Sequence, residues 1–338
     1  MGKRSMTGIT RRQVLGASLV GAGLAMVGCS RRDEAPLLAT DTQPSGYPTV
    51  EALRHFSQDL KERTGGRLRT TVYPSGQLGS QNDTLELAQF GGVDLIRINI
   101  SPLNVIAPQS VIPALPFLFR STDHMRRAMD GAPGEAILRS LETHGLIGLA
   151  YYDSGARSLY TSRRLIQHPD DLKGLKIRVQ TSDLFVSMVE ALGGDATPMA
   201  YSEVYQGLMQ GVIDGAENNW PSYHSSRHFE VAPYLSETRH VMAPEVLAMS
   251  RYRWQKLDEA DRDHVRQAAR ASVGVMRELW DAREISARQA VLAAGVATSE
   301  ELDHEAFVAR VQPVWQHYLK RPELRRLTED IQAMGGAG

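Results

Sequence analysis

Side chains that could bind a small anion gather in residues 171–220. Arg178 lies in the run DLKGLKIRVQ, in which apolar and polar residues alternate. Asn218 ends a short apolar segment, Tyr201 lies between the two, and Trp220 adds an indole ring. A guanidinium presents a planar fork that can hold a carboxylate through two parallel hydrogen bonds. These residue types predict a binding site for a small anion that also carries hydrogen-bonding groups.

The elements predicted for this stretch would bring the four residues together. Alternation predicts a strand at 175–180, helical spacing predicts helices at 182–194 and 200–211, and a short segment after each helix predicts another strand. In a parallel α/β sheet, ligands bind beyond the carboxyl ends of the strands, which is where Arg178 and Asn218 fall. Two alternatives stay open, because Arg178 could be an outward surface charge and Trp220 could belong to the core.

The rest of the chain predicts more strands and helices in alternation. We expect strands at 37–40, 67–73, 93–100 and 145–152, helices at 48–64, 85–90, 121–131 and 304–320, and an irregular, partly buried segment at 101–119. The continuous apolar run at 145–152 is typical of a central strand buried on both faces. A helix should begin after Asp258 and continue to Gly295, long enough to cross two lobes unless a kink near Gly274 divides it.

A weak internal repeat points to two similar lobes that face each other. The segment LELAQFGGVDLIRIN resembles YQGLMQGVIDGAENN, and Asn99 and Asn218 take matching places in the two copies. The alternative is that any βαβ unit has this pattern. If the lobes face each other, Arg97 and Asn99 would reach the cleft from the first lobe.

The N-terminus is predicted to be an export signal over residues 1–28. A basic start with Arg11 and Arg12, as in a twin-arginine signal, precedes an apolar run too short to cross a bilayer comfortably. The sequence MVGC, ending at Cys29, is similar to a bacterial lipobox, so Cys29 is a candidate lipidation site and 29–36 a lipid-anchored tether to the membrane. Export with cleavage elsewhere is the alternative. In both cases the working protein would be periplasmic, and its single cysteine excludes disulfides.

Composition and motifs set several functional classes aside. The 338 residues are enough for two domains, and the net charge of −1 comes with no basic patch, so we expect no nucleic-acid partner. No G-x-S-x-G, phosphate-binding loop or calcium loop is found, and we expect neither a metal nor a cofactor. His224 and His228 have the spacing of a metal pair on a helix, which leaves an exported enzyme as an alternative. A sensory module that presents a ligand to a membrane kinase is a third class.

Taken together, these segments resemble the solute-binding proteins of TRAP (tripartite ATP-independent periplasmic) transporters. The matching motifs, from the N-terminus onward, are YPSGQLG, LPFLF, YYDSGAR, DLKGLKIRVQ and ALGGDATPMAYSEVYQGLMQGVIDGAEN. They follow one another along the mature chain in the order typical of that family. The resemblance implies a two-lobed α/β periplasmic binding protein fold, with a mixed five-stranded sheet in each lobe, strands that cross the hinge and a long helix over both lobes. It implies lobe I at 37–153 plus 244–283 and lobe II at 154–243 plus 284–338.

The resemblance also implies roles for individual residues in a non-catalytic protein that delivers its ligand to a membrane permease. Arg178 matches the arginine that pairs with the ligand carboxylate, and Arg157 matches a second arginine common in the family. Asn218 matches an amide on the same carboxylate, and Tyr201 an aromatic residue that covers the ligand. Asp153 is a further candidate in the YYDSGAR segment, although it could instead pair with Arg157 structurally.

The motifs IRIN, YYDSGARS and GAENNWPSY are similar to the branch of this family that takes hexuronates such as glucuronate or galacturonate. A uronate has one carboxylate for an arginine and several hydroxyls that need donors and acceptors. Arg97, Asn99, Glu217 and Asn218 could supply these, and Trp220 or Tyr201 could stack on the sugar ring. Aromatic, 2-oxo and C4-dicarboxylic acids stay open as alternative ligands.

Overall fold

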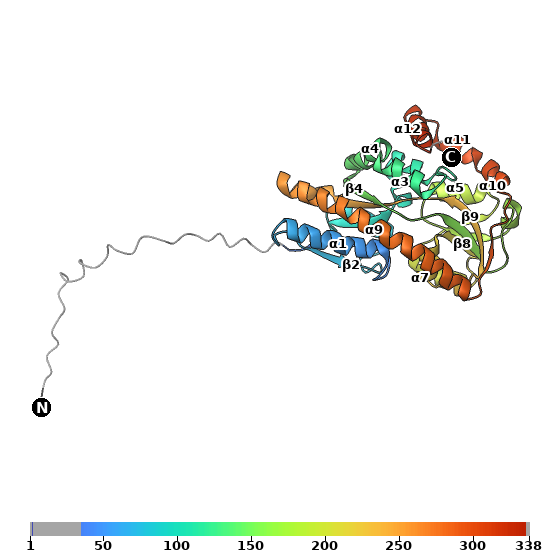
Figure 1. Cartoon of the computed structure of the whole chain (residues 1–338), viewed down its shortest axis with the longest axis horizontal. Helices are drawn as coiled ribbons and strands as arrows, with labels where there is room; N and C mark the ends of the chain where they lie inside the picture. The colour runs from blue at the N-terminus through green and yellow to red at the C-terminus, as the bar shows by residue number, and fades with distance from the viewer. Residues whose placement is uncertain (1, 3–34, 336–338) are drawn as a thin grey trace. The chain divides into compact units, whose positions relative to one another are not determined.

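The computed structural model describes residue 2 and residues 35–335 of the chain, which form an α/β structure with two mixed sheets (Figure 1). The predicted export signal at 1–28, Cys29 and all but the end of the predicted tether at 29–36 lie outside the described residues.

The first sheet contains five strands in the order β2-β1-β3-β10-β4. Its strands are β1 (Leu37–Thr40), β2 (Thr70–Tyr73), β3 (Leu95–Asn99), β4 (Leu146–Tyr152) and β10 (Glu245–Ser250). β1, β2 and β3 are parallel, whereas β10 is antiparallel to both β3 and β4. The prediction of a central strand at 145–152 is wrong. β10 inserts between β3 and β4, so β4 lies at the sheet edge and its residues 147–149 are only half-buried.

The second sheet contains six strands in the order β11-β9-β5-β8-β6-β7. Its strands are β5 (Arg157–Thr161), β6 (Lys176–Val179), β7 (Asp195–Pro198), β8 (Gly215–Asn218), β9 (Tyr234–Val241) and β11 (Ala297–Ser299). β6 is parallel to both β7 and β8, which confirms the predicted parallel strand–helix–strand–helix–strand unit. The sixth strand, beyond the five expected, is the three-residue β11 that pairs with β9.

Helices begin where the sequence offers caps or a proline in the first turn. Pro48 stands at the start of α1, and Ser80 and Asp83 form a capping box at the start of α2. The shorter helices are α1 (Pro48–Arg63), α2 (Gln81–Gln89), α3 (Thr122–Asp130), α4 (Ala132–Ser140), α5 (Asp183–Ala191), α6 (Val204–Met209), α7 (Trp220–Ser225), α8 (Arg251–Trp254), α10 (His304–Arg310), α11 (Gln312–Tyr318) and α12 (Pro322–Ala333). Two 3₁₀ helices, η1 (Ser101–Val105) and η2 (Pro108–Ala114), occupy the segment expected to be irregular.

The long helix α9 (Glu259–Ala293) confirms the helix predicted after Asp258. The Asp258 side chain accepts a hydrogen bond from the amide of Asp261 at 2.7 Å, which satisfies one of the free donors of the first turn. The helix is continuous through Gly274, so it is not two separate helices. It runs alongside α1 at one end and α7 at the other, and thereby packs on elements of both sheets (Figure 1).

Two short connections link the sheets beside α9. Residues 153–156 join β4 of the first sheet to β5 of the second, and residues 242–244 join β9 back to β10. The strands that flank them pair with each other, because Tyr152 lies opposite Glu245 and Arg157 opposite Val241. The connections therefore lie side by side. The exact lobe boundaries given above stay a prediction.

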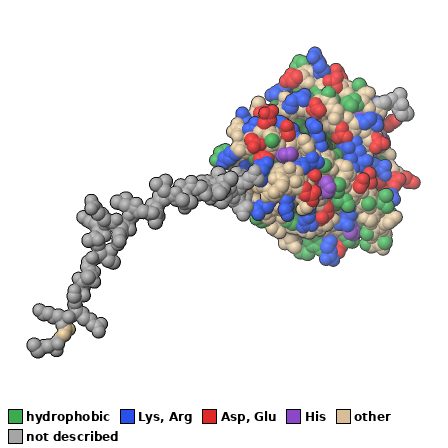
Figure 2. Space-filling view, turned by 60° about the vertical axis from the view of Figure 1, so that its left-hand side comes forward, with side chains coloured by type: hydrophobic (Ala, Val, Ile, Leu, Met, Phe, Trp, Pro, Cys, Tyr) green, Lys and Arg blue, Asp and Glu red, His purple; other side chains and the backbone are tan. Residues whose placement is uncertain are grey.

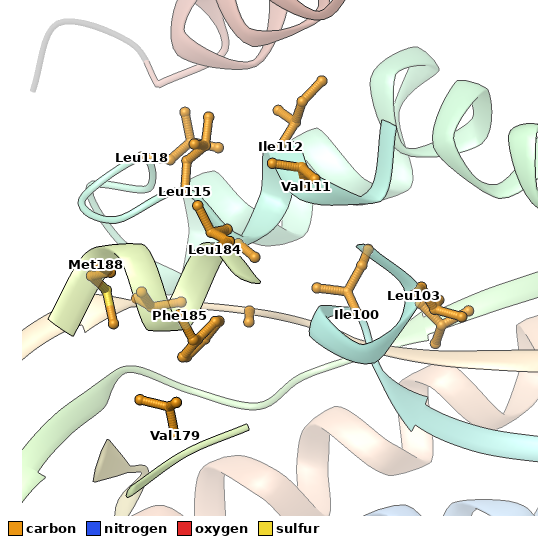
Figure 3. Close-up of a cluster of buried hydrophobic side chains, with 14 of the residues drawn as sticks. Ile100, Leu103, Val111, Ile112, Leu115, Leu118, Val179, Leu184, Phe185 and Met188 are labelled. Atoms are coloured by element: carbon orange, nitrogen blue, oxygen red, sulfur yellow. The ribbon is translucent and has the colours of Figure 1, made fainter. Parts of the chain in front are cut away.

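A hydrophobic cluster also joins the two halves. Leu184, Phe185 and Met188 of α5 belong to the same buried cluster as Leu115 and Leu118, which follow η2. Figure 3 shows Leu184 lying next to Leu115. This apolar contact packs α5, which belongs to the half with the second sheet, against the segment at 101–119, which follows β3 of the first sheet.

The surface shown in Figure 2 carries basic and acidic side chains interspersed, as the composition indicates. Each helix in the described part of the chain is too short or too polar to cross a membrane.

Candidate ligand-binding site between the two sheets

The carboxyl ends of β3, β6 and β8 meet around a narrow cavity of about 20 Å³. Arg97 and Asn99 come from β3, Arg178 from β6 and Asn218 from β8, so both sheets contribute. A volume of this size holds about one water molecule. The full lining is Thr42, Gln43, Gln81, Arg97, Asn99, Arg157, Arg178, Gln180, Tyr201, Asn218, Asn219, Ser222 and Glu245.

A much wider cleft of about 640 Å³ adjoins this cavity. The two spaces share part of their lining, namely Thr42, Gln81, Arg178, Gln180 and Tyr201. The cleft therefore gives access to the cavity, and Arg178 stands at the junction between them.

Arg178 is buried, with 3% of its surface exposed, and its charge has no acidic partner within ion-pair distance in the described part of the chain. Its Nε and Nη2 donate to the carbonyl oxygen of Met199 at 2.9 and 2.7 Å. Burial lowers the pKa of this guanidinium, which is the expected effect of removing a cation from water. An outward surface position for Arg178 is thus excluded. A buried cation without an anion is costly, so the site is suited to receive one.

Arg157 also lines the cavity, but Glu217 already balances its charge. Its Nε and Nη2 bind the Glu217 carboxylate, the latter at 2.7 Å, and its Nη1 donates to Asn218 Oδ1 at 2.9 Å. Burial tends to lower the pKa of Arg157, but the adjacent Glu217 outweighs burial and the pKa is raised. The suggested pairing of Arg157 with Asp153 does not occur, because Asp153 binds Arg126 Nε at 2.7 Å.

Three predicted residues lie away from the narrow cavity. Glu217 is fully buried behind Arg157, and Asp153 lies between Arg126 and Arg277 beside α9. Trp220 is buried and borders a different pocket, where the guanidinium of Arg288 lies 5.6 Å from its ring centre. The structure therefore brings together Arg178, Arg157, Asn218, Tyr201, Arg97 and Asn99, but not Glu217, Asp153 and Trp220.

Arg97 and Asn99 hold the first-sheet side of the cavity together. Arg97 binds the carboxylate of Asp41 through Nη2 and that of Glu245 through Nη1, the latter at 2.7 Å. Burial tends to lower the pKa of Arg97, but these two carboxylates outweigh it and the pKa is raised. Asn99 Nδ2 donates to Glu245 Oε1 at 3.1 Å. Both Arg97 and Glu245 are thus fixed in position.

Sequence reasoning missed Gln180 and Glu245, among others. Gln180 Nε2 donates to Asn99 Oδ1 at 3.3 Å, a hydrogen bond that joins the two sides of the cavity. Gln180 lies two residues after Arg178, and side chains at this spacing share one face of a strand, so its position could have been inferred. Glu245 lies opposite Asn99 in the register of β10 and β3, a long-range pairing for which the local sequence holds no signal.

The two histidines of the alternative metal site make separate contacts and do not form a pair. α7 ends at Ser225, so His224 and His228 do not share a helix. His228 Nδ1 hydrogen-bonds Tyr160 Oη at 2.8 Å, and His224 stacks on Phe229 with ring centres 5.9 Å apart. Over residues 35–335 no three side chains of the metal-binding types cluster.

Several known proteins are similar to this chain over most of its length. A solute-binding protein of Chromohalobacter salexigens is 44% identical over 290 residues, which is 86% of each chain. A crystal structure of a TRAP periplasmic solute-binding protein from a Bradyrhizobium species, in complex with α/β-D-galacturonate, has a TM-score of 0.86 and 49% identity over 88% of this chain and all of that one. Another, from C. salexigens with bound D-glucuronate, has a TM-score of 0.86 and 42% identity over 88% of this chain and 99% of that one.

A family model identifies the chain independently of any single relative. Residues 39–321 match the bacterial extracellular solute-binding proteins of family 7. The match includes both sheets, the two connections and α9. Because it spans most of the chain and agrees with the fold, the protein belongs to family 7 of the bacterial extracellular solute-binding proteins, the solute-binding proteins of TRAP transporters.

Proposed function

We propose that this protein captures a hexuronate, such as glucuronate or galacturonate, in the cavity and cleft between its sheets and delivers it to a TRAP permease. The observation that carries this proposal is the guanidinium of Arg178 at the junction of the two spaces, which is buried and has no acidic ion-pair partner among residues 35–335. A ligand carboxylate would supply the missing anion through two parallel hydrogen bonds. Relatives at 49% and 42% identity that hold galacturonate and glucuronate support this class of ligand.

The other cavity residues suit the hydroxyls of a sugar acid. Asn99, Gln180 and Asn218 present amides that can both donate and accept, and Tyr201 borders both the cavity and the cleft. We assign the carboxylate to Arg178, with Asn218 and Arg157 beside it, and the ring face to Tyr201. Glu217 then acts indirectly, since its two oxygens hold Arg157 in place.

Binding on this account requires the two sheets to separate. The cavity of about 20 Å³ is far smaller than a six-carbon acid, and direct hydrogen bonds close it. Gln180 donates to Asn99 at 3.3 Å, and Tyr47 Oη shares a hydrogen bond with Ser222 Oγ at 2.9 Å. A ligand that replaces these contacts would hold the closed form through its own groups. The connections at 153–156 and 242–244, with α9, are the natural hinge.

We further propose that the protein is non-catalytic and acts in the periplasm. Family 7 proteins are extracellular solute-binding proteins, which supports a site built for capture rather than chemistry. The twin-arginine signal and the lipidation of Cys29 rest on the sequence at 1–29 alone.

Calorimetry and thermal shift with a ligand panel test this function. The panel pairs each uronate with its neutral sugar (glucuronate with glucose, galacturonate with galactose) and adds one aromatic, one 2-oxo and one C4-dicarboxylic acid. We expect a uronate to raise the melting temperature and to be recovered unchanged, while its neutral partner has no effect. A panel in which no uronate binds, or in which glucose binds as well as glucuronate, contradicts the proposal.

A further inference from the structure

Charge is distributed unevenly across the narrow cavity. On the first-sheet side, Arg97 binds two carboxylates, Asp41 and Glu245, so these three groups carry one negative charge in excess. On the opposite side, Arg157 binds the carboxylate of Glu217 and Arg178 has no acidic ion-pair partner among residues 35–335, so these three groups carry one positive charge in excess. A ligand in the cavity therefore lies between a positive wall and a negative wall.

Glu245 is the part of the negative wall that a ligand can touch. Its carboxylate lines the cavity and is 10% exposed, whereas Asp41 is fully buried and lines neither the cavity nor the cleft. Glu245 Oε2 accepts from Arg97 at 2.7 Å and Oε1 from Asn99 at 3.1 Å. Each carboxylate oxygen has a second lone pair, so Glu245 can still accept a hydrogen bond from a ligand.

The backbone of Glu245 is also fixed within the first sheet. Glu245 is the first residue of β10, a strand that pairs with β3 on one side and β4 on the other, so its backbone is fixed opposite Asn99 and Tyr152. An ionised carboxylate accepts hydrogen bonds but has none to donate. A ligand hydroxyl at this point would be bound, whereas a ligand carboxylate would meet a like charge at close range.

We propose that Glu245 determines the charge of the ligand: it selects acids with one carboxylate and hydroxyl groups at the far end, and it excludes acids with a carboxylate at both ends. The inference rests on the proposed function, because it assumes that the ligand's first carboxylate binds Arg178. It makes the C4-dicarboxylic acids and the aldaric acids, the sugar acids oxidised at both ends, poor ligands of this protein.

Calorimetry with three six-carbon acids tests the inference. Glucuronate has one carboxylate, glucarate has two, and gluconate is the open-chain acid with one. We expect the wild-type protein to bind glucuronate about 100-fold more tightly than glucarate, since opposing like charges costs several kcal/mol. Gluconate, which matches the open-chain shape of glucarate, should bind more tightly than glucarate.

Glu245→Gln removes the charge and keeps the shape, and it should narrow the ratio of the glucuronate and glucarate affinities to about tenfold or less, mainly by tightening glucarate. The same two ligands are compared in the wild-type and Glu245→Gln proteins, so the difference in ligand shape cancels. The change in the ratio of their affinities therefore reports the charge of residue 245. Asp41→Asn is the matched control, because it takes a carboxylate from the same Arg97 without changing the cavity lining. Asp41→Asn should lower the melting temperature and keep most of the preference for glucuronate over glucarate.

The outcomes separate this inference from the proposed function. If no uronate binds the wild-type protein, the proposed function fails. If glucuronate binds but glucarate binds within tenfold of it, or if Glu245→Gln leaves the ratio unchanged, only the role of Glu245 is overturned. The wild-type comparison can overturn the role of Glu245 even if the Glu245 variant does not fold.

Discussion

The three buried arginines of the site differ in what balances their charge. Arg97 has two carboxylates and Arg157 has one, whereas Arg178 has a backbone carbonyl as its hydrogen-bond partner. The pKa follows the same division: it is raised for Arg97 and Arg157 by their acidic partners and lowered for Arg178 by burial. Arg97 and Arg157 are therefore already paired within the cavity walls, and we propose that Arg178 binds the anion of the ligand.

His228 makes a prediction about acid stability. Burial, with a smaller contribution from Arg178, lowers the pKa of His228 to about 3, while an unfolded chain would titrate near about 6.5. Between these values the unfolded state binds a proton that the folded state does not, so the free energy of unfolding falls as pH falls. The slope from this one group approaches about 1.4 kcal/mol per pH unit.

Urea unfolding at pH 7 and pH 5 measures this effect. His228→Asn, which keeps an acceptor for Tyr160, should lose less stability between the two pH values than the wild-type protein. The exposed His317 offers the matched control, and His317→Asn should behave as wild type. Equal losses in the wild-type protein and His228→Asn would show that His228 is not a buried neutral group.

The sequence predicts the site residues that lie on neighbouring βαβ strands, but not those that come from distant parts of the chain. Arg178 and Asn218 end strands that lie close in sequence, so their meeting follows from the parallel βαβ rule. Glu217 precedes Asn218 on the same strand, and successive residues of a strand point to opposite faces, so both could not face one cavity. Glu245 comes from β10, 146 residues beyond the Asn99 that it contacts, and no local pattern indicates such a pairing.

At the scale of elements, α9 carries a glycine that its packing does not need. Gly274 lies in the middle of the helix, is exposed, and has open space where a β-carbon would be. Glycine in a helix interior is less stable than alanine by about 0.5–1 kcal/mol. Gly274→Ala should therefore raise the melting temperature by about 1–3 °C, as measured by calorimetry.

At Gly155, in the connection at 153–156, we expect alanine to destabilise the protein. The φ of Gly155 is +58°, and a β-carbon there would lie 3.1 Å from the Trp280 ring. Gly155→Ala should lower the melting temperature, because it adds both backbone strain and a steric contact.

If Gly274→Ala destabilised the protein instead, α9 would need flexibility at its centre.

The elements themselves were predictable where the signal is local. The cap at Asp258 and the helical spacing after it predict α9, and alternation around Arg178 predicts β6. The apolar run of β4 predicts a strand but not its place in the sheet, because that place depends on β10, which arrives from the second sheet. The three-residue β11 is too short to have a detectable period.

At the scale of the whole molecule, attachment to a membrane through Cys29 is a prediction from the sequence of residues 1–29. If Cys29 is the lipidated N-terminus, the wild-type protein should sediment with membranes, and Cys29→Ser should release it into the soluble periplasmic fraction. Immunoblots of fractionated cells measure this. The same distribution for both proteins would remove the anchor from the account and leave ligand binding untouched.

Calorimetry of glucuronate binding to Arg178→Ala tests most directly whether the guanidinium of Arg178 binds the ligand carboxylate. Truncating one side of a buried charge pair should weaken binding by at least about 2 kcal/mol, or roughly 30-fold. Arg139→Ala, which removes a surface arginine whose side chain is 68% exposed, should bind as wild type. Wild-type affinity in a folded Arg178→Ala protein would contradict the account.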